Sequence, residues 1–250
     1  MVSIWFLLTT VAEQLTKALK CSHEANVFAC SACSELLPTS FWDRLSSRRF
    51  NLEPDTYHIT TLTDCLAKSY FEQTSPSQQT VESAWAKLRG SLLHYSVRSL
   101  GWSELRAKLT FELDGRTITV VGYIDAYDPE TATIYDLKTT RFVKWQLEKR
   151  LIPRENHVAQ VQCYSTLLGE YGIPVDRLVL VYVDDKDIVP LQVPLGNRRG
   201  WIIRRATALH RTLENHENAT PEVGFACKYC PFVSICPQDN GSLKFDEAMA

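Results

Sequence analysis

Two aspartates and one lysine in the middle of the chain have the residue types needed for metal-assisted phosphodiester hydrolysis. Asp125, Asp136 and Lys138 all fall between Gly122 and Thr139. Carboxylate oxygens suit hard divalent ions such as Mg²⁺ and Mn²⁺, which activate water for attack on phosphorus. The lysine would orient that water or stabilise the developing charge. The alternative is a solvated strand face with an ordinary salt bridge, and residues outside this stretch must decide between the two interpretations.

A β-hairpin is expected to position these side chains. Residues 117–127 and 132–140 are rich in β-branched and aromatic residues, and the intervening residues 128–131 include a proline. Runs of this composition are typical of strands, and the proline fixes φ at a turn position. A four-residue loop over 128–131 then places Tyr127 opposite Ala132.

The predicted register puts both acids on one face of the hairpin. Asp125 falls opposite Ile134, so Asp125 and Asp136 become diagonal neighbours, about 7 to 8 Å apart at the backbone. Because side chains alternate faces along a strand, Lys138 joins the acids while Leu137 points to the other side. Two carboxylates at this separation can reach one small cation.

The composition predicts one sizeable core and indicates no charge-driven partner by itself. The chain has 250 residues, of which 45% are hydrophobic and 22% charged, which suits one core with at most a small appendage. With 27 basic and 29 acidic residues the formal charge is −2, so nucleic-acid binding needs a local basic patch. No apolar run reaches bilayer length and the first residues lack the pattern of a signal peptide, so we expect a cytoplasmic protein without a membrane partner.

Further strands and helices are expected around the hairpin. Strands are predicted over 104–111, 176–183 and 188–193, and helices over 60–71, 81–100, 156–171 and 200–214. The Asp114-Gly115 pair predicts a tight turn between two strands. One helix carries His94, and another places Gln160 and Tyr164 on the same face because they are four residues apart.

A basic stretch follows the hairpin. It contains Arg141, Lys144, Lys149, Arg150 and Arg154, with Trp145 among them. Clustered cations can follow a phosphate backbone, and an indole ring can stack on a base. The alternative is a solvated helix face.

The eight cysteines indicate metal or cluster ligands rather than disulfides. Three of them lie close together near the end of the chain: Cys227, Cys230 and Cys236. Three ligands leave a four-coordinate site one short, and Cys65 is the favoured fourth, which would tie distant parts of the chain together. Cys30 and Cys33 have the spacing of a metal knuckle, but no second pair follows nearby, so we interpret them as small core residues.

In chain order, these residues resemble the motif set of the RecB-type branch of the PD-(D/E)XK nucleases. The set is Gly90-x-x-x-His94, Gly122-x-Ile-Asp125, Asp136-Leu-Lys138, Gln160-x-x-x-Tyr164 and a lone Cys65 with the three terminal cysteines. Within that branch, the size and the four cysteines are most similar to the CRISPR-associated iron-sulfur exonucleases. The resemblance spans residues 60–237. It implies an α/β fold with a restriction-endonuclease-like mixed sheet flanked by helices.

The resemblance also implies how the catalytic residues act. His94, Asp125 and Asp136 would bind Mg²⁺ or Mn²⁺, and the backbone carbonyl of Leu137 would add a ligand. Lys138 would position the attacking water. Asp136 stands where many relatives carry glutamate, and this shorter side chain could change the metal spacing.

Two further sets of residues complete the expected site. The residues expected to contact DNA are Gln160, Tyr164, Arg141 and Lys144, of which the first two also organise the site. The residues expected to hold an iron-sulfur cluster, with [4Fe–4S] favoured over [2Fe–2S], are Cys65, Cys227, Cys230 and Cys236. Cys65 lacks the proline and basic pair that commonly follow it in the family.

The expected activity is metal-dependent exonucleolytic hydrolysis of single-stranded DNA ends, which would trim DNA before an integrase inserts it into a CRISPR array. DNA and the integrase proteins are the expected partners, and a homo-oligomer is left open. Residues 56–220 are expected to form the nuclease core and 221–250 the iron-sulfur segment and tail, while 1–55 have no counterpart in the family. The rival functions are a non-catalytic DNA-end-binding subunit and a zinc-stabilised adaptor. The two acids argue against a pure binder, which does not require them beside an anionic backbone.

Overall fold

The computed structural model describes residues 53–75, 81–99, 104–215 and 220–237. The chain divides into two compact units, residues 1–50 with 77–91 and residues 51–76 with 92–250. Helix α6 (Val81–Ser99) contributes residues to both units, and His94 belongs to the second. Every contact discussed below lies within that second unit. Cys30 and Cys33, which are interpreted above as small core residues, lie outside the described residues.

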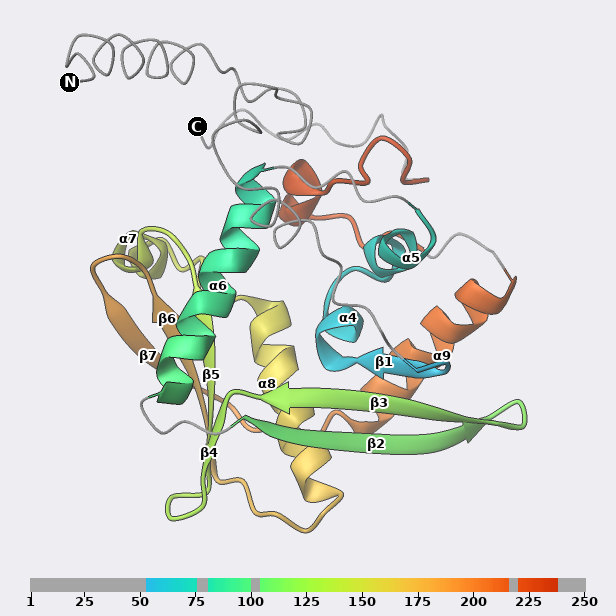
Figure 1. Cartoon of the computed structure of the whole chain (residues 1–250), viewed down its shortest axis with the longest axis horizontal. Coiled ribbons are helices and arrows are strands. Elements are labelled where there is room, and N and C mark those ends of the chain that lie inside the picture. The colour runs from blue at the N-terminus through green and yellow to red at the C-terminus, as the bar shows by residue number, and fades with distance from the viewer. Residues whose placement is uncertain (1–52, 76–80, 100–103, 216–219, 238–250) are drawn as a thin grey trace, which may run out of the picture. The chain divides into compact units, whose positions relative to one another are not determined.

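The first sheet has three strands in the order β1-β3-β2 (Figure 1). Strand β1 (Thr56–His58) is parallel to β3 (Arg116–Ile124), and β2 (Leu105–Leu113) is antiparallel to it. Asp114 and Gly115 connect β2 and β3, with φ of 51° and 80°. Positive φ at both positions is the signature of the predicted tight hairpin turn, because it matches the twist of the flanking strands.

The second sheet has four strands in the order β4-β5-β6-β7. Strand β5 (Thr133–Thr139) pairs antiparallel with β4 (Ala126–Asp128) and parallel with β6 (Arg177–Val183), and β6 pairs antiparallel with β7 (Ile188–Val193). The predicted mixed sheet is therefore two mixed sheets. The predicted strand over 117–127 breaks at Asp125, which lies in a bend between β3 and β4.

The predicted register of the hairpin over residues 117–140 was wrong by two residues. Tyr127 pairs with Ile134 rather than Ala132, and Asp128 pairs with Thr133. The side chain of Asp128 accepts the backbone N–H of Glu130 at 2.9 Å and the hydroxyl of Thr131 at 2.5 Å. These bonds hold Asp128 at the end of the strand and leave Ala132 in the loop with φ of 47°.

Seven helical segments are described in the ranges given above. Besides α6 they are α4 (Ile59–Thr63), α5 (Leu66–Thr74), α7 (Val143–Glu148), α8 (Glu155–Gly169), α9 (Arg199–Asn215) and the short 3₁₀ helix η2 (Phe225–Tyr229). The predicted helix over 60–71 is two helices, because Asp64 leaves helical geometry and its carboxylate accepts the N–H of Cys65 at 2.9 Å. None of the helices within these ranges is long and apolar enough to span a membrane.

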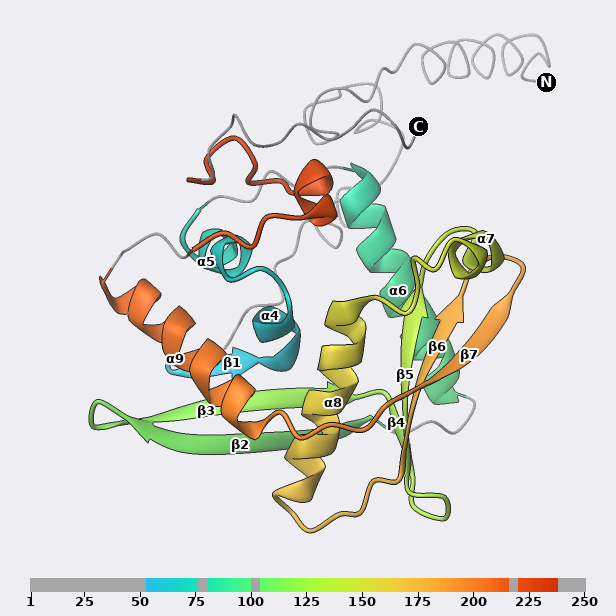
Figure 2. The ribbon, with the colours of Figure 1, turned by 180° about the vertical axis from the view of Figure 1, so that it is seen from behind.

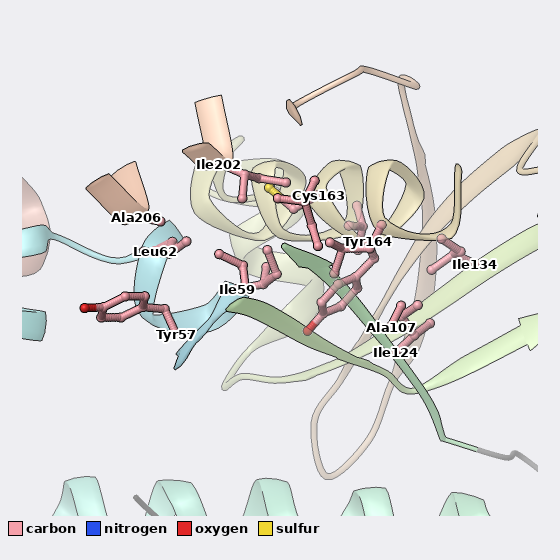
Figure 3. Packing of buried hydrophobic residues seen from close by; sticks show 14 of the residues in the cluster. Tyr57, Ile59, Leu62, Ala107, Ile124, Ile134, Cys163, Tyr164, Ile202 and Ala206 are labelled. Atoms are coloured by element: carbon pink, nitrogen blue, oxygen red, sulfur yellow. The ribbon is translucent and has the colours of Figure 1, made fainter. Parts of the chain in front are cut away.

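Helix α8 joins the two sheets, since it packs against strands of both (Figures 1 and 2). Its buried apolar side chains include Val161, Tyr164, Leu167 and Leu168. Their three- and four-residue spacing forms one stripe along the helix. Figure 3 shows Tyr164 pointing from α8 down toward the strands, with Ile202 of α9 beside Cys163. Each fully buried leucine contributes about 1.5–3 kcal/mol, so this stripe fixes α8 firmly under the bend at Asp125.

Candidate active site

Asp125 sits in the bend where the chain passes from one sheet to the other, and two contacts fix its carboxylate. One oxygen, Oδ2, accepts the backbone N–H of Leu137 at 2.7 Å. The other, Oδ1, lies 3.0 Å from Nδ1 of His94. The side chain is 9% exposed. Both oxygens are therefore anchored while the group still reaches the surface.

His94 approaches this carboxylate from α6. The hydrogen bond to Asp125 raises the pKa of His94, although burial opposes the shift and the charge of Asp136 adds to it. The imidazole of His94 therefore faces the two carboxylates of Asp125 and Asp136. A divalent cation on the same carboxylates would compete with the proton of His94 for these groups.

Asp136 and Lys138 lie on one face of β5, as the sequence predicts. Nζ of Lys138 is 2.8 Å from Oδ2 of Asp136 and donates to Oε1 of Gln160 at 2.9 Å. The amide of Gln160 donates to Oδ1 of Asp136 at 3.3 Å and to the hydroxyl of Tyr164 at 2.7 Å. Gln160 therefore connects the acid, the lysine and the tyrosine.

Burial dominates the electrostatics of Asp136, whose side chain is 2% exposed. Burial raises its pKa to about 6, and the nearby charge of Lys138 opposes that rise. Oδ2 of Asp136 lies 2.8 Å from the ammonium of Lys138. A divalent cation at this buried oxygen would have to share it with that ammonium or displace it.

The oxygen and nitrogen donors of His94, Asp125 and Asp136 fit a hard divalent ion. Among the described residues, their ligand atoms are not all within 4.8 Å of one another. The contact seen at Leu137 is made by its N–H, and coordination by its carbonyl stays a prediction.

Gly122, three residues before Asp125, lies where β3 packs closely on α8. A Cβ at this position would lie 2.8 Å from Cδ1 of Leu167 and 2.9 Å from the ring of Tyr164. Real Cβ atoms do not approach other heavy atoms so closely, so glycine lets β3 come close to α8 at this point. The first acid and the tyrosine that supports Gln160 are thereby held together.

His157 lies behind Lys138, and sequence reasoning missed it. Its Nδ1 is 2.8 Å from the hydroxyl of Tyr182, which also accepts the N–H of Arg154 at 3.1 Å. Burial, together with the charges of Lys138 and Arg154, lowers the pKa of His157 to about 3. Its position one helical turn before Gln160 is the sequence signal that could have identified it.

The predicted DNA-contacting residues divide into two groups. Gln160 and Tyr164 are 6% and 2% exposed, so they lie beneath the site. Arg141 and Lys144 are exposed beyond the end of β5. Nζ of Lys144 is 2.6 Å from Oδ1 of Asp187, so part of its charge is already balanced.

A second group of possible metal ligands was not predicted. Atoms of Asp55, His210 and Glu214 lie within 4.8 Å of one another. Arg116 places Nη1 2.9 Å from Glu214 and 3.7 Å from Asp55. The guanidinium already supplies a cation to both acids, and no local pattern brings these residues together in the sequence.

Glu222 contacts two of the four cysteines predicted as cluster ligands, Cys65 and Cys227. The backbone N–H of Glu222 donates to Sγ of Cys65 at 3.4 Å, and its carbonyl is 4.0 Å from Sγ of Cys227. Burial raises the pKa of Cys230, and the charges of Cys65 and Cys227 raise it further. Cys236 is half-buried and, like the other three, forms no disulfide.

Arg205 of α9 holds these segments together. It donates to the carbonyls of Leu62 and Asp64, next to Cys65, and to Oε2 of Glu222 at 2.9 Å. Its guanidinium also lies 5.0 Å from the ring centroid of Trp201. The turn that carries Cys65 is thus joined to the C-terminal cysteine segment.

Comparison with known proteins gives one family. The family model of the PD-(D/E)XK nuclease superfamily matches residues 41–237. The CRISPR-associated exonuclease Cas4 of Saccharolobus solfataricus is 25% identical over 198 residues, which covers 74% of this chain and 89% of that protein.

Two solved structures are similar to this chain, and the first shares its fold. The crystal structure of SSO0001 matches with a TM-score of 0.60 and 22% identity, and the match covers 80% of this chain and 96% of that chain. An alkaline exonuclease from Laribacter hongkongensis, LHK-Exo, has a TM-score of 0.42 and 13% identity over 65% of this chain and 89% of that chain.

Proposed function

The chain belongs to the PD-(D/E)XK nuclease superfamily, and from this we propose that it is a divalent-metal-dependent deoxyribonuclease acting on the ends of single-stranded DNA. The observation that carries the proposal is the meeting of Asp125, Asp136 and Lys138 above Gln160. Buried and anchored carboxylates beside a lysine are the parts that metal-dependent hydrolysis of a phosphodiester requires.

In this proposal Asp125, Asp136 and His94 hold Mg²⁺ or Mn²⁺, with the carbonyl of Leu137 as a further ligand. The bound ion would lower the pKa of a coordinated water and neutralise charge on the phosphate. Oδ2 of Asp125 keeps its position through the N–H of Leu137. The carboxylate of Asp136 keeps its orientation through Gln160.

Lys138 is proposed to orient the attacking water and stabilise the developing negative charge. Its ammonium group has three N–H donors. Asp136 and Gln160 occupy two directions at 2.8 and 2.9 Å, which leaves a third for water or phosphate. Gln160 and Tyr164 act from beneath, by holding Lys138 and Asp136 in place.

The same proposal includes an iron-sulfur cluster on Cys65, Cys227, Cys230 and Cys236. The spacing of the three terminal cysteines and the distant Cys65 supports this ligand set. Four thiolates could also hold a tetrahedral zinc ion, as in a zinc-stabilised adaptor. Iron and zinc analysis of the purified protein separates the two.

A role in trimming DNA for CRISPR spacer acquisition, with integrase proteins as partners, follows from the similarity to the CRISPR-associated exonuclease Cas4. The rival function is a non-catalytic DNA-end-binding subunit. Asp125 and Asp136 favour the nuclease, because two carboxylates repel a phosphate backbone unless a cation lies between them.

The experiment that tests the proposal is digestion of end-labelled single-stranded DNA with Mn²⁺. The wild-type protein should degrade the strand, and Lys138→Ala should not. Lys108→Ala is the matched control, because Lys108 is an exposed lysine of β2. This variant should cut the strand like the wild type. If the wild type binds the strand without cutting it, the end-binding subunit is the better account.

A further inference from the structure

Phe142 adopts a backbone conformation that is unfavourable for its residue type. Its φ of 56° and ψ of 52° are left-handed, a region that bulky side chains rarely enter. Its side chain is also 71% exposed, so burial of the ring does not offset the strain. The position follows the catalytic Lys138 by four residues. Strain that stability does not explain is typical of functional positions.

The backbone around Phe142 is fixed on both sides. The N–H of Val143 donates to Oδ2 of Asp184 at 2.7 Å. The side-chain amide of Gln146 donates to Oγ1 of Thr140 at 2.7 Å and to the carbonyl of Arg141 at 2.6 Å. Phe142 is thus a rigid projection at the end of the strand that carries Asp136 and Lys138.

At the other end of α7 a basic residue, Arg150, also has a left-handed backbone conformation. Arg150 has φ of 55°, a position that usually holds glycine. Its N–H donates to the carbonyl of Leu147 at 3.0 Å, and the N–H of Leu151 donates to the carbonyl of Gln146 at 2.9 Å. This pair of bonds is the Schellman pattern, so Arg150 is fixed in place.

The surface between these two ends combines exposed rings and exposed cations. Trp145 is 52% exposed, and Arg141, Lys149 and Arg150 are exposed as well. In the described part of the chain none of these three cations takes part in an ion pair with a described residue, whereas Lys144 is paired with Asp187. We call Phe142, Trp145, Lys149 and Arg150 the α7 platform; its helix follows β5 in Figure 1.

We propose that the α7 platform binds the unpaired strand next to the scissile phosphate, with Phe142 stacking on a base and Arg150 and Lys149 contacting phosphates. The inference rests on the proposed DNA substrate. Aromatic rings stack on any base, and nearby cations follow the backbone. A base within a duplex is already stacked on both sides, so a rigid Phe142 selects single-stranded DNA. Leu147 and Leu151 are exposed apolar side chains on the same surface. The competing hypothesis is therefore that this surface binds another protein.

The test measures DNA binding by the full-length protein in Ca²⁺, with a single-stranded oligonucleotide and a blunt duplex as separate probes. Phe142→Leu keeps an apolar side chain but removes stacking. It should weaken single-strand binding by about 5- to 150-fold, the range expected for one stacked base, and leave duplex binding unchanged. Phe142→Trp should bind like wild type. Leu195→Ala is the control for loss of exposed apolar surface, since Leu195 is 51% exposed and lies in the loop between β7 and α9, beside the C-terminal end of α8.

Two readouts separate stacking from a structural role. A 2-aminopurine in the strand should be quenched by the wild type and not by Phe142→Leu. Phe142→Asn should raise the Tm by about 2–4 °C, because asparagine tolerates the left-handed region, while it weakens single-strand binding as Phe142→Leu does. A lower Tm for Phe142→Asn would show that the ring serves the fold.

The outcomes distinguish this inference from the proposed function. If the wild type cuts single-stranded DNA and Phe142→Leu binds it equally well, the proposed DNA binding by the α7 platform is wrong, while the proposed nuclease activity is supported. If Phe142→Leu changes the oligomeric state in light scattering and not DNA binding, the surface contacts a second copy instead. If the wild type neither cuts nor binds single-stranded DNA, the proposed function itself fails.

Discussion

The carboxylate of Asp125 accepts the backbone N–H of Leu137 at 2.7 Å, so the acid in the bend between two sheets is tied to the strand that carries the second acid. Strand pairing alone does not set this relationship, because the pairing of β4 with β5 ends at Ala126 and Tyr135. A side chain to backbone bond therefore fixes the position of Asp125 relative to β5. Asp136 needs no such bond, since it is itself part of β5.

Asp125→Asn and Asp125→Ala should separate the charge of this residue from its structural bond. Asparagine can still accept the N–H of Leu137 but supplies no negative charge, so it should keep the wild-type Tm and lose at least about 100-fold in cleavage. Alanine also leaves that N–H unpaired, at a cost of about 1–3 kcal/mol. End-labelled digestion and thermal melting measure the two effects. Cleavage by Asp125→Asn at the wild-type rate would rule out a metal-binding role for this carboxylate.

Metal binding should strengthen as the pH rises through about 6. Burial raises the pKa of Asp136 to about 6, so folding favours its protonated form. In the metal-free protein this contribution to stability is complete below the unfolded pKa of about 3.9 and is lost as the pH rises through about 6. Above that pH the buried anion costs stability and is available to a cation. The rise in Tm caused by Mn²⁺ should therefore be larger at pH 7 than at pH 5.

Asp136→Asn is the control for this pH dependence. The variant has no carboxylate to titrate, so Mn²⁺ should raise its Tm by a small and nearly constant amount between pH 5 and pH 7. The pKa of His94 is also raised, by its bond to Asp125, so some dependence can persist through that group. Equal Mn²⁺ effects on the wild type at both pH values would contradict the assignment of Asp136.

Gln160→Leu should reduce cleavage by about 10- to 100-fold, the usual effect of removing a group that orients a metal ligand. The variant removes the acceptor for Lys138 and the donor to Asp136. Gln162→Leu is a matched control, because Gln162 is equally buried on the same helix but contacts Arg198 and the carbonyl of Pro194. Comparison of Tm and rate for the two variants gives the result. If both lose the same activity, Gln160 matters only for stability.

The two faces of β5 could be predicted from the sequence, because side chains along a strand alternate with a period of two. The predicted loop was displaced by two residues, but an even shift moves no side chain to the opposite face. Asp136 and Lys138 therefore share a face as expected. The Asp114-Gly115 turn was also predictable, since few residues adopt positive φ at two successive positions.

The ends of some strands and helices depend on hydrogen bonds of single side chains, which composition and periodicity do not predict. Asp128 ends its strand through bonds to Glu130 and Thr131, and Asp64 breaks a helix through its bond to Cys65. A strand-like composition on both sides of Asp125 conceals the bend between the two sheets. The left-handed Phe142 has no signal at all, because nothing in the local sequence requires a positive φ there.

Gly122→Ala should lower both stability and activity. Its Cβ would collide with Leu167 and with the ring of Tyr164, and overpacking of this kind costs about 1–3 kcal/mol. Displacement of Tyr164 would also loosen Gln160. Gly169→Ala is the matched control, since a Cβ there meets no atom within 4 Å. Thermal melts of both variants should show a loss only for Gly122→Ala; equal Tm values would contradict the close packing of β3 on α8.

Cys230→Ser should reduce bound iron and lower the Tm. Cys230 is half-buried within the C-terminal segment and lies among the charges of Cys65 and Cys227, so a missing ligand would release the cluster and free that segment from the turn at Cys65. Cys163→Ala is the control: Cys163 is buried on α8, and its loss should lower the Tm without changing the iron content. Iron analysis and the visible absorption spectrum of the purified proteins measure the difference. Iron content unchanged in Cys230→Ser would mean that the ligand set is wrong, and zinc in place of iron would favour the adaptor.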